Sequence, residues 1–129
     1  MNKTILIVED NFANLKLATT VLEHAGYRVL GVESALDAIA IAQREAPHLI
    51  LMDIQLPGMN GLDATRRLKE QPGTADIPVF ALTALAMKGD EERILGAGCD
   101  GYIAKPFDYK ELLARVESKV GNAQTLIES

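Results

Sequence analysis

Cysteine and long apolar runs are scarce in this sequence, and each scarcity excludes a class of protein. The single cysteine, Cys99, cannot form an internal disulfide, and its neighbours Gly98 and Asp100 predict a buried structural thiol in a reducing compartment. No apolar run approaches the roughly 18 residues of a transmembrane helix. Charges at residues 9 and 10 interrupt the apolar N-terminal segment, which excludes a signal peptide. We therefore expect a cytoplasmic protein without membrane insertion.

Basic clusters and the P-loop glycine pattern are also absent. The chain has 13 basic and 18 acidic residues, a formal net charge of −5, whereas a nucleic-acid-binding surface usually carries a positive stripe. The pattern G-x-x-x-x-G-K-[ST] does not occur, which disfavours a nucleotide-binding module of the P-loop type. The two histidines, His24 and His48, and the one cysteine lack the spacing of a zinc site. We therefore expect neither direct binding to nucleic acid nor zinc chemistry.

The sequence does contain a regular alternation of short apolar runs and longer segments of helical period. Its 129 residues, 48% of them apolar, suit one compact domain, which we place at residues 1–121 with a short tail at 122–129. Predicted strands lie at residues 4–8, 27–32, 49–52, 79–82 and 102–104. Predicted helices lie at about residues 15–25, 34–46, 61–70, 87–97 and 108–120, with Ser34 and Asp108 as the N-caps of the second and fifth.

The first, third and fourth apolar runs are nearly continuous rather than alternating. Continuous runs of this length indicate strands that are buried on both faces of a parallel sheet. Each connection between strands is long enough for a helix, so parallel strands with right-handed crossovers are the simplest topology. The predicted fold class is therefore α/β, a doubly wound five-stranded parallel sheet covered by helices.

Polar residues end four of these strands. Glu9 and Asp10 follow the first strand, Asp53 the third, Thr83 the fourth and Lys105 the fifth. In an open parallel sheet, functional groups gather beyond the carboxyl ends of the strands. If the first and third strands are neighbours, three carboxylates converge at one edge of the sheet.

Three converging carboxylates need a counter-charge. Two unit charges about 5 Å apart repel by roughly 3 kcal/mol at an effective dielectric of about 20, so three pairs would oppose folding by roughly 10 kcal/mol. Either one group is protonated or a cation binds, and oxygen ligands from two strand ends suit Mg²⁺ or Mn²⁺. The alternative is that Glu9 and Asp10 are solvated charges capping the first helix, while Asp53 begins a turn.

Lys105 and Pro106 add a cation at the same edge. The lysine can reach an anion held between a metal and Asp53. The proline restricts the backbone that presents the lysine and permits a cis peptide bond. This combination is typical of a phosphoryl-transfer site, which needs a carboxylate beside bound Mg²⁺ together with a lysine and a threonine hydroxyl. At such a site Asp53 would attack as the nucleophile.

These residues resemble the receiver domains of two-component response regulators. Glu9-Asp10, Asp53, Thr83 and Lys105-Pro106 stand in that family's order and approximate spacing, with PGMNG at residues 57–61 after the aspartate. The resemblance covers essentially the whole chain. It implies a flavodoxin-like (CheY-like) fold with strand order 2-1-3-4-5, and no output domain after the fifth helix.

The resemblance also implies how phosphate and metal are held. Asp53 would be the phosphoacceptor and would receive the phosphoryl group from a histidine kinase or a histidine phosphotransferase. Asp10 and Asp53 would bind Mg²⁺ directly, and the backbone carbonyl of Gln55 would be a further ligand. Glu9 would hold the metal through a water molecule.

By the same resemblance, three residues would transmit the phosphorylation signal. Lys105 would pair with the phosphoryl group, Thr83 would be the switch hydroxyl, and Tyr102 would be the switch aromatic. The alternative for Tyr102 is an ordinary half-buried strand residue. The signal would leave through the surface of the fourth helix, fifth strand and fifth helix toward a downstream protein, and the chain would be a monomer or a weak dimer.

The closer likeness is to single-domain regulators of the DivK type. ILIVEDN at residues 5–11, ALAMKGDEERI at 84–94 and GCDGYIAKP at 98–106 carry it, and it implies bacterial cell-cycle or polarity control. Three alternatives stay open. They are that the chain acts as an intermediate phosphate carrier in a phosphorelay, as a phosphorylation-independent adaptor, or as a Mg²⁺-dependent phosphohydrolase. The absence of a second acid two residues after Asp53 disfavours the phosphohydrolase.

Overall fold

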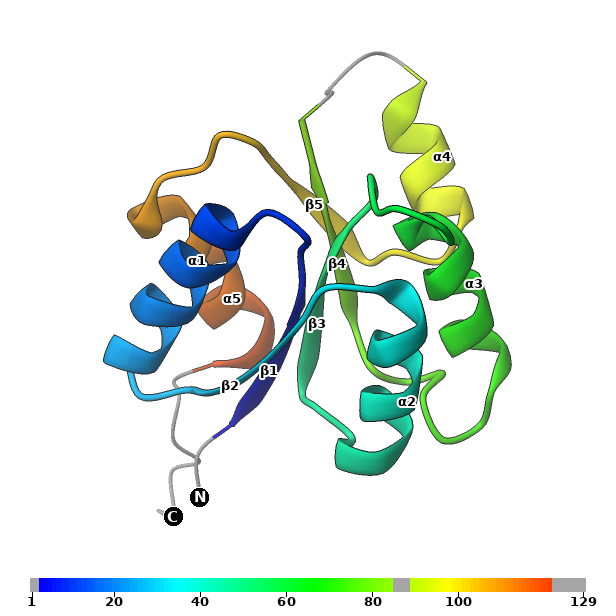
Figure 1. The fold of residues 1–129 in the computed structure, drawn as a ribbon, viewed down its shortest axis with the longest axis horizontal. Helices are drawn as coiled ribbons and strands as arrows, with labels where there is room; N and C mark the ends of the chain where they lie inside the picture. Colours follow the sequence, from blue (N-terminus) through cyan, green and yellow to red (C-terminus); the bar gives the residue numbers. More distant parts are fainter. Residues whose placement is uncertain (1–2, 85–88, 122–129) are drawn as a thin grey trace.

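The structure is a computed structural model of the 129-residue chain, and it describes residues 3–84 and 89–121. Within these ranges strands and helices alternate strictly, as predicted (Figure 1). The strands are β1 (Thr4–Val8), β2 (Arg28–Val32), β3 (Leu49–Asp53), β4 (Val79–Thr83) and β5 (Gly101–Ala104). The helices are α1 (Phe12–His24), α2 (Ala35–Glu45), α3 (Gly61–Glu70), α4 (Asp90–Gly96) and α5 (Tyr109–Val120). No helix in the described ranges is long and apolar enough to cross a membrane.

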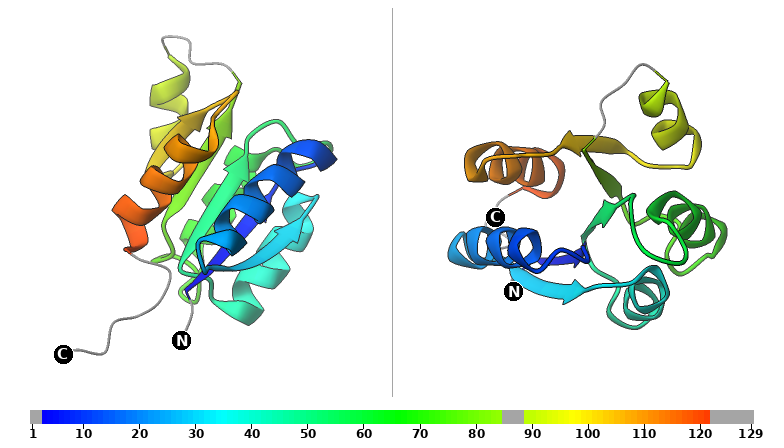
Figure 2. Two further views of the ribbon diagram at one scale, coloured as in Figure 1. Left: turned by 90° about the vertical axis from the view of Figure 1, so that its left-hand side faces the viewer. Right: turned by 45° about the horizontal axis from the view of Figure 1, so that its top comes forward.

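The sheet is parallel throughout and has the order β2-β1-β3-β4-β5, which confirms the predicted topology. Helices α1 and α5 cover one face, and α2, α3 and α4 cover the other (Figures 1 and 2). Every residue of the central strands β1, β3 and β4 is buried, as their continuous apolar runs predicted. Because successive strand residues point to opposite faces, Leu6 and Ile50 join one core, whereas Ile5 and Leu51 join the other.

Asp53 and Thr83 are the last residues of their strands, whereas the sequence predicted both to lie one position beyond. The hydrogen-bond ladder of the sheet extends to Asp53 and Thr83 because the residues that follow β3 and β5 still donate hydrogen bonds to β4. The backbone N–H of Ile54 donates to the Leu82 carbonyl at 3.2 Å, and that of Lys105 donates to the Thr83 carbonyl at 2.7 Å. The sheet itself therefore holds the backbone of both polar residues.

Polar side chains begin four of the helices. Ser34 and Asp108 each accept a hydrogen bond from the N–H three residues later, which confirms them as N-caps. Helix α1 begins at Phe12, earlier than predicted, because the side chain of Asn11 caps it in the same way. The predicted start of the fourth helix, near Met87, lies outside the described residues.

Cys99 lies just before β5 and is buried, as predicted. Its Sγ lies 3.9 Å from the Thr65 hydroxyl oxygen on α3. Burial raises the pKa of the thiol above its usual range, so the unreactive protonated form is favoured. Cys99 is therefore a structural residue of the α3–β5 contact.

Candidate functional site

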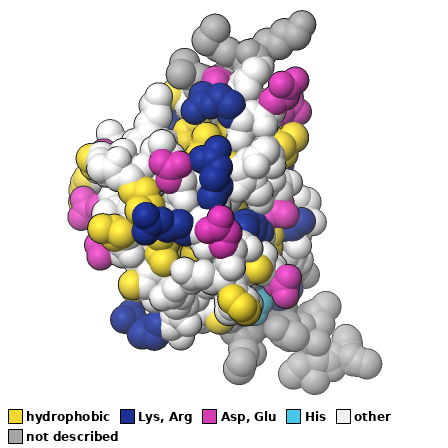
Figure 3. Space-filling view, turned by 90° about the vertical axis from the view of Figure 1, so that its right-hand side faces the viewer, with side chains coloured by type: hydrophobic (Ala, Val, Ile, Leu, Met, Phe, Trp, Pro, Cys, Tyr) yellow, Lys and Arg dark blue, Asp and Glu magenta, His cyan; other side chains and the backbone are white. Residues whose placement is uncertain are grey.

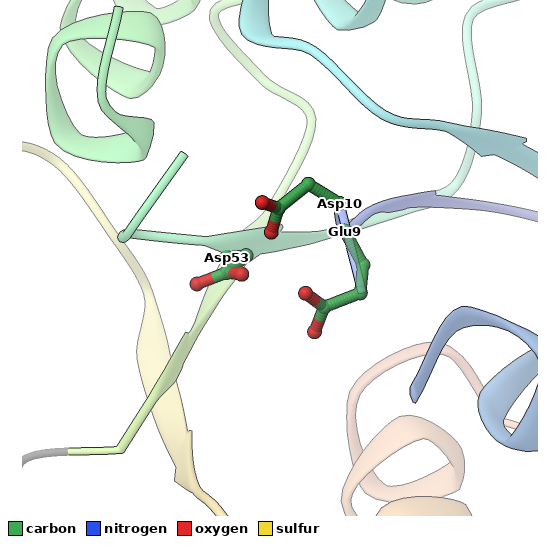
Figure 4. Close-up of side chains that lie close together, drawn as sticks. All are labelled: Glu9, Asp10 and Asp53. Atoms are coloured by element: carbon green, nitrogen blue, oxygen red, sulfur yellow. The ribbon is translucent and has the colours of Figure 1, made fainter. Parts of the chain in front are cut away.

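Three carboxylates converge where β1 and β3 end, as the sequence predicted. Strands β1 and β3 are neighbours, with Val8 beside Met52 in the register. Glu9, Asp10 and Asp53 each offer an oxygen atom, and these atoms lie within 4.8 Å of one another. Figure 4 shows the three side chains directed into the same space. At such distances the carboxylates repel one another strongly unless a proton or a cation intervenes.

The three carboxylates differ in how far they are buried. Glu9 is 1% exposed and Asp53 is 3% exposed, whereas Asp10 is solvent-exposed. The reading of Glu9 as a solvated helix cap is therefore wrong, because the side chain is inside the protein and Asn11 caps α1 instead. Glu9 still supports the helix start, since its Oε2 accepts a hydrogen bond from the Asn11 N–H at 3.2 Å.

The turn reading of Asp53 is compatible with a functional role. Its Oδ1 accepts a hydrogen bond from the Gln55 N–H at 2.9 Å, which closes a tight turn after β3. Its Oδ2 lies 3.1 Å from the Lys105 ammonium. One oxygen therefore holds the loop, and the other faces the charged site.

Lys105 is placed between the two buried carboxylates. Its Nζ lies 2.7 Å from Glu9 Oε1 and 3.1 Å from Asp53 Oδ2. The Lys105–Pro106 peptide bond, which follows β5, is cis. One ammonium among three ionised carboxylates leaves a net charge of −2, which suits a divalent cation.

The pKa values of Glu9 and Lys105 are both shifted by burial and by the charges packed around them. Burial raises the pKa of Glu9 above its usual value of 4.5, and the nearby Asp53 carboxylate raises it further. Burial alone would lower the pKa of Lys105, but its pairing with Glu9 and the field of Asp53 outweigh burial and raise it. Lys105 is thus held in its charged form.

Glu9 Oε1 has unused capacity to accept hydrogen bonds. Although it is buried and lies close to the Lys105 ammonium, it has no hydrogen bond of good geometry within the described part of the chain. Buried carboxylate oxygens without such a partner are unusual. Together with the two other carboxylates, this atom fits a site for a hard cation such as Mg²⁺, held directly or through water.

The remaining predicted residues lie at or near the same edge. Thr83 is 1% exposed at the end of β4, where it pairs in register with Ala104. Gln55 is exposed in the turn after Asp53. Tyr102 lies further back, beside Ala81, where it is half-buried against the core under α4. Tyr102 is therefore not part of the carboxylate cluster.

Two residues that support the site were not predicted from the sequence to do so. Asn11 caps the helix that follows the acidic pair, a role that its residue type and position signal. Gly61 begins α3 directly against the backbone of Asp53. No local signal distinguishes this glycine from one required by a turn, because the approach is between segments that only the fold brings together.

Comparison with known proteins identifies the family. Residues 5–117 match the family model of the response regulator receiver domain. The chain belongs to this receiver family. With 46% identity over 123 residues, this receiver domain is similar to the polar-differentiation response regulator DivK of Brucella ovis. The match covers 95% of this chain and 100% of that relative, which confirms the resemblance found in the sequence.

Solved structures agree with this assignment. The receiver domain of a sensor histidine kinase from Pseudomonas aeruginosa is 38% identical, with a TM-score of 0.87 over 95% of this chain and 100% of that one. That structure has a magnesium ion coordinated in its active site cleft. The chemotaxis response regulator CheY4 of Vibrio cholerae, at 24% identity, has a TM-score of 0.87 over 92% of this chain and 98% of that one. At this low identity, the match supports only the CheY-like fold of the chain.

The face of this receiver domain formed by α2, α3 and α4 carries basic and acidic side chains side by side (Figure 3). Several of these basic groups are paired. Arg66 lies 2.8 Å from Asp63, and Lys69 lies 3.2 Å from Asp100. The exposed Arg66–Asp63 pair adds little stability, but both pairs offset positive charge on this face.

Proposed function

We propose that this receiver domain accepts a phosphoryl group on Asp53 from a phosphohistidine of a histidine kinase or a histidine phosphotransferase. The observation that supports the proposal most directly is the buried Asp53 carboxylate beside the Lys105 ammonium and two further carboxylates. The DivK relative and the receiver domain of a histidine kinase support the same reaction class. The chain would then be a signalling protein rather than an enzyme that turns over a separate substrate.

The donor set fits Mg²⁺, and we infer that Mn²⁺ would substitute for it. Asp10, Asp53 and the backbone carbonyl of Gln55 would bind the ion directly, and Glu9 would hold it through water. When bound, the divalent ion supplies positive charge that offsets the charge on the phosphoryl oxygens. Asp10 is the most exposed of the three carboxylates, so it is the one that an entering ion meets first.

In the transfer, a carboxylate oxygen of Asp53 attacks the phosphorus of the donor phosphohistidine. An O–P bond forms, the N–P bond breaks, and its electron pair stays on the donor imidazole. Lys105 is already 3.1 Å from Asp53 Oδ2, so its ammonium is in place to pair with the transferred group. The β3 ladder holds the Asp53 backbone, which limits the reorganisation that the reaction needs.

Phosphorylation would then bias a two-state equilibrium. The new phosphoryl oxygens would accept a hydrogen bond from the Thr83 hydroxyl, which lies at the end of the neighbouring strand. Tyr102 would turn further inward under α4. The surface formed by α4, β5 and α5 would thereby change its affinity for a downstream protein, in a cytoplasmic pathway of the polarity or cell-cycle type.

Asp53→Asn tests the acceptor. Wild-type protein incubated with acetyl phosphate and MgCl₂ should gain one phosphoryl group per chain, detected by intact mass, and Asp53→Asn should gain none. Asp37→Asn, which changes a carboxylate in the first turn of α2, should be labelled like the wild type. Stoichiometric labelling of Asp53→Asn would exclude Asp53. Rapid catalytic turnover of acetyl phosphate by the wild type would favour a phosphohydrolase instead.

A further inference from the structure

The first residue of α3 packs against the backbone of the proposed phosphoacceptor. A Cβ atom added to Gly61 would lie 2.9 Å from the Asp53 carbonyl carbon, 2.9 Å from Ile54 Cα and nearer still to the Asp53 carbonyl oxygen. Cβ atoms do not approach backbone this closely. Gly58, by contrast, has a φ of +76° and no atom within 4 Å of such a Cβ. Gly58 is therefore required for its conformation, whereas Gly61 is required for close approach.

Hydrogen bonds hold this close approach in place. The Gly61 N–H donates to the Ile54 carbonyl at 3.3 Å, which ties the start of α3 to the end of β3. The Thr65 hydroxyl, which is fully buried, donates to the Gly61 carbonyl at 2.8 Å. The Asn60 side chain caps the helix by accepting the Asp63 N–H at 2.9 Å. The first turn of α3 is thus braced directly behind Asp53.

We propose that Gly61, held by Thr65, is a positioning residue that sets the place of the Asp53 carboxylate and the turn at Gln55. This inference rests on the proposed function of Asp53. Any side chain at position 61 must push either α3 or the end of β3 away. A displacement of the strand end moves Asp53 relative to Lys105 and the two other carboxylates, and small displacements of reacting groups have large effects on rate.

Two matched pairs of variants test the proposal. Gly61→Ala adds the clashing Cβ, whereas Gly73→Ala adds a Cβ in open space. Thr65→Val removes the buried hydrogen bond at the start of α3. Thr74→Val removes an equally buried one, from the Thr74 hydroxyl to the Leu68 carbonyl at 2.6 Å, at the far end of the helix. Each threonine variant loses one hydroxyl-to-carbonyl bond, so their stability losses should be similar. Thr65→Val also loses the long contact with the Cys99 Sγ at 3.9 Å, which is too weak to change that comparison much.

Two quantities are measured. The first is the Kd for Mg²⁺, obtained by titrating MgCl₂ alone and recording backbone amide NMR shifts. The second is the rate of labelling by acetyl phosphate. In Gly61→Ala we expect the Mg²⁺ Kd to rise about tenfold and the labelling rate to fall about 100-fold. In Thr65→Val we expect the Kd to rise about threefold. Gly73→Ala and Thr74→Val should keep the wild-type Kd and rate.

A purely structural role predicts a different result. If folded Gly61→Ala or Thr65→Val binds Mg²⁺ and is labelled like the wild type, the proposal is overturned, however much stability the variant has lost. If Gly61→Ala does not fold, the comparison of Thr65→Val with Thr74→Val decides the question alone. Failure of the proposed function is recognised separately, because the wild-type protein itself would then not be labelled on Asp53.

Discussion

Lys105 and Glu9 form a nearly buried ion pair, with Nζ 2.7 Å from Oε1 and side-chain exposures of 17% and 2%. Because the Lys105 ammonium offsets the carboxylate charge, Lys105→Met should destabilise the metal-free protein by about 3 kcal/mol. The same change removes a positive charge that competes with Mg²⁺, so the Mg²⁺ Kd should fall several-fold. Urea denaturation with and without MgCl₂ measures both effects.

Lys110→Met is the matched control for this prediction, since Lys110 is exposed on α5 and lies over the Tyr109 ring. It should change neither the stability nor the Mg²⁺ affinity by a measurable amount. If Lys105→Met were as stable as the wild type in the absence of Mg²⁺, Lys105 would not be the counter-charge of the cluster.

Removing the charge of Glu9 should have the opposite effect on stability. Because burial and Asp53 raise the folded-state pKa of Glu9, its contribution is fully present below pH 4.5 and is lost as the pH rises through the folded-state pKa. Glu9→Gln should therefore stabilise the metal-free protein at pH 7 and abolish this part of the pH dependence. It should also weaken Mg²⁺ binding. Thermal unfolding from pH 4 to pH 8, with and without MgCl₂, would reveal each change, and an unchanged pH profile would refute the prediction.

Thr83 should be needed for switching but not for phosphorylation. Thr83→Ala should be labelled by acetyl phosphate like the wild type, because the hydroxyl does not take part in bond formation. It should lose most of the phosphate-dependent gain in partner affinity, since a hydrogen bond to a charged group contributes about 2 kcal/mol, or roughly 30-fold. Thr83→Ser should retain the gain. The measurement is partner binding by phosphorylated and unphosphorylated protein, and a full gain in Thr83→Ala would exclude the switch role.

Tyr27 fixes the end of α5 and should make stability fall in alkaline solution. Its hydroxyl donates a hydrogen bond to the Gly121 carbonyl at 2.6 Å. Burial, with a smaller effect of Glu117, raises the pKa of Tyr27 above 10, so its contribution is present below pH 10 and is lost as the pH rises through the folded-state value. Tyr27→Phe should cost about 1 kcal/mol at pH 7.

Urea denaturation at pH 7 and pH 10.5 tests this expectation. The stability difference between wild type and Tyr27→Phe should shrink at the higher pH. Tyr109→Phe, which alters an exposed tyrosine on α5, should match the wild type at both pH values. A difference between wild type and Tyr27→Phe that does not change with pH would show that the hydroxyl does not titrate as expected.

The alternation of strands and helices followed from the sequence alone because its signals are local. A buried central strand such as β3 needs a continuous apolar run, and a helix needs apolar residues at spacings of three and four. The N-caps Ser34 and Asp108 were recognisable for the same reason. The strand order, by contrast, came from the family resemblance, since hydrophobic periodicity does not tell which strands are neighbours.

The sequence by itself determined that Glu9, Asp10, Asp53 and Lys105 stand at strand ends, because position along a strand is a property of the chain. Only the tertiary structure decided that Glu9 is buried while Asp10 is exposed, and that Lys105 lies between Glu9 and Asp53. It alone brought Gly61 against the Asp53 carbonyl. Burial, pairing and close approach depend on segments that are distant along the chain, and no local pattern of residues encodes the distance between them.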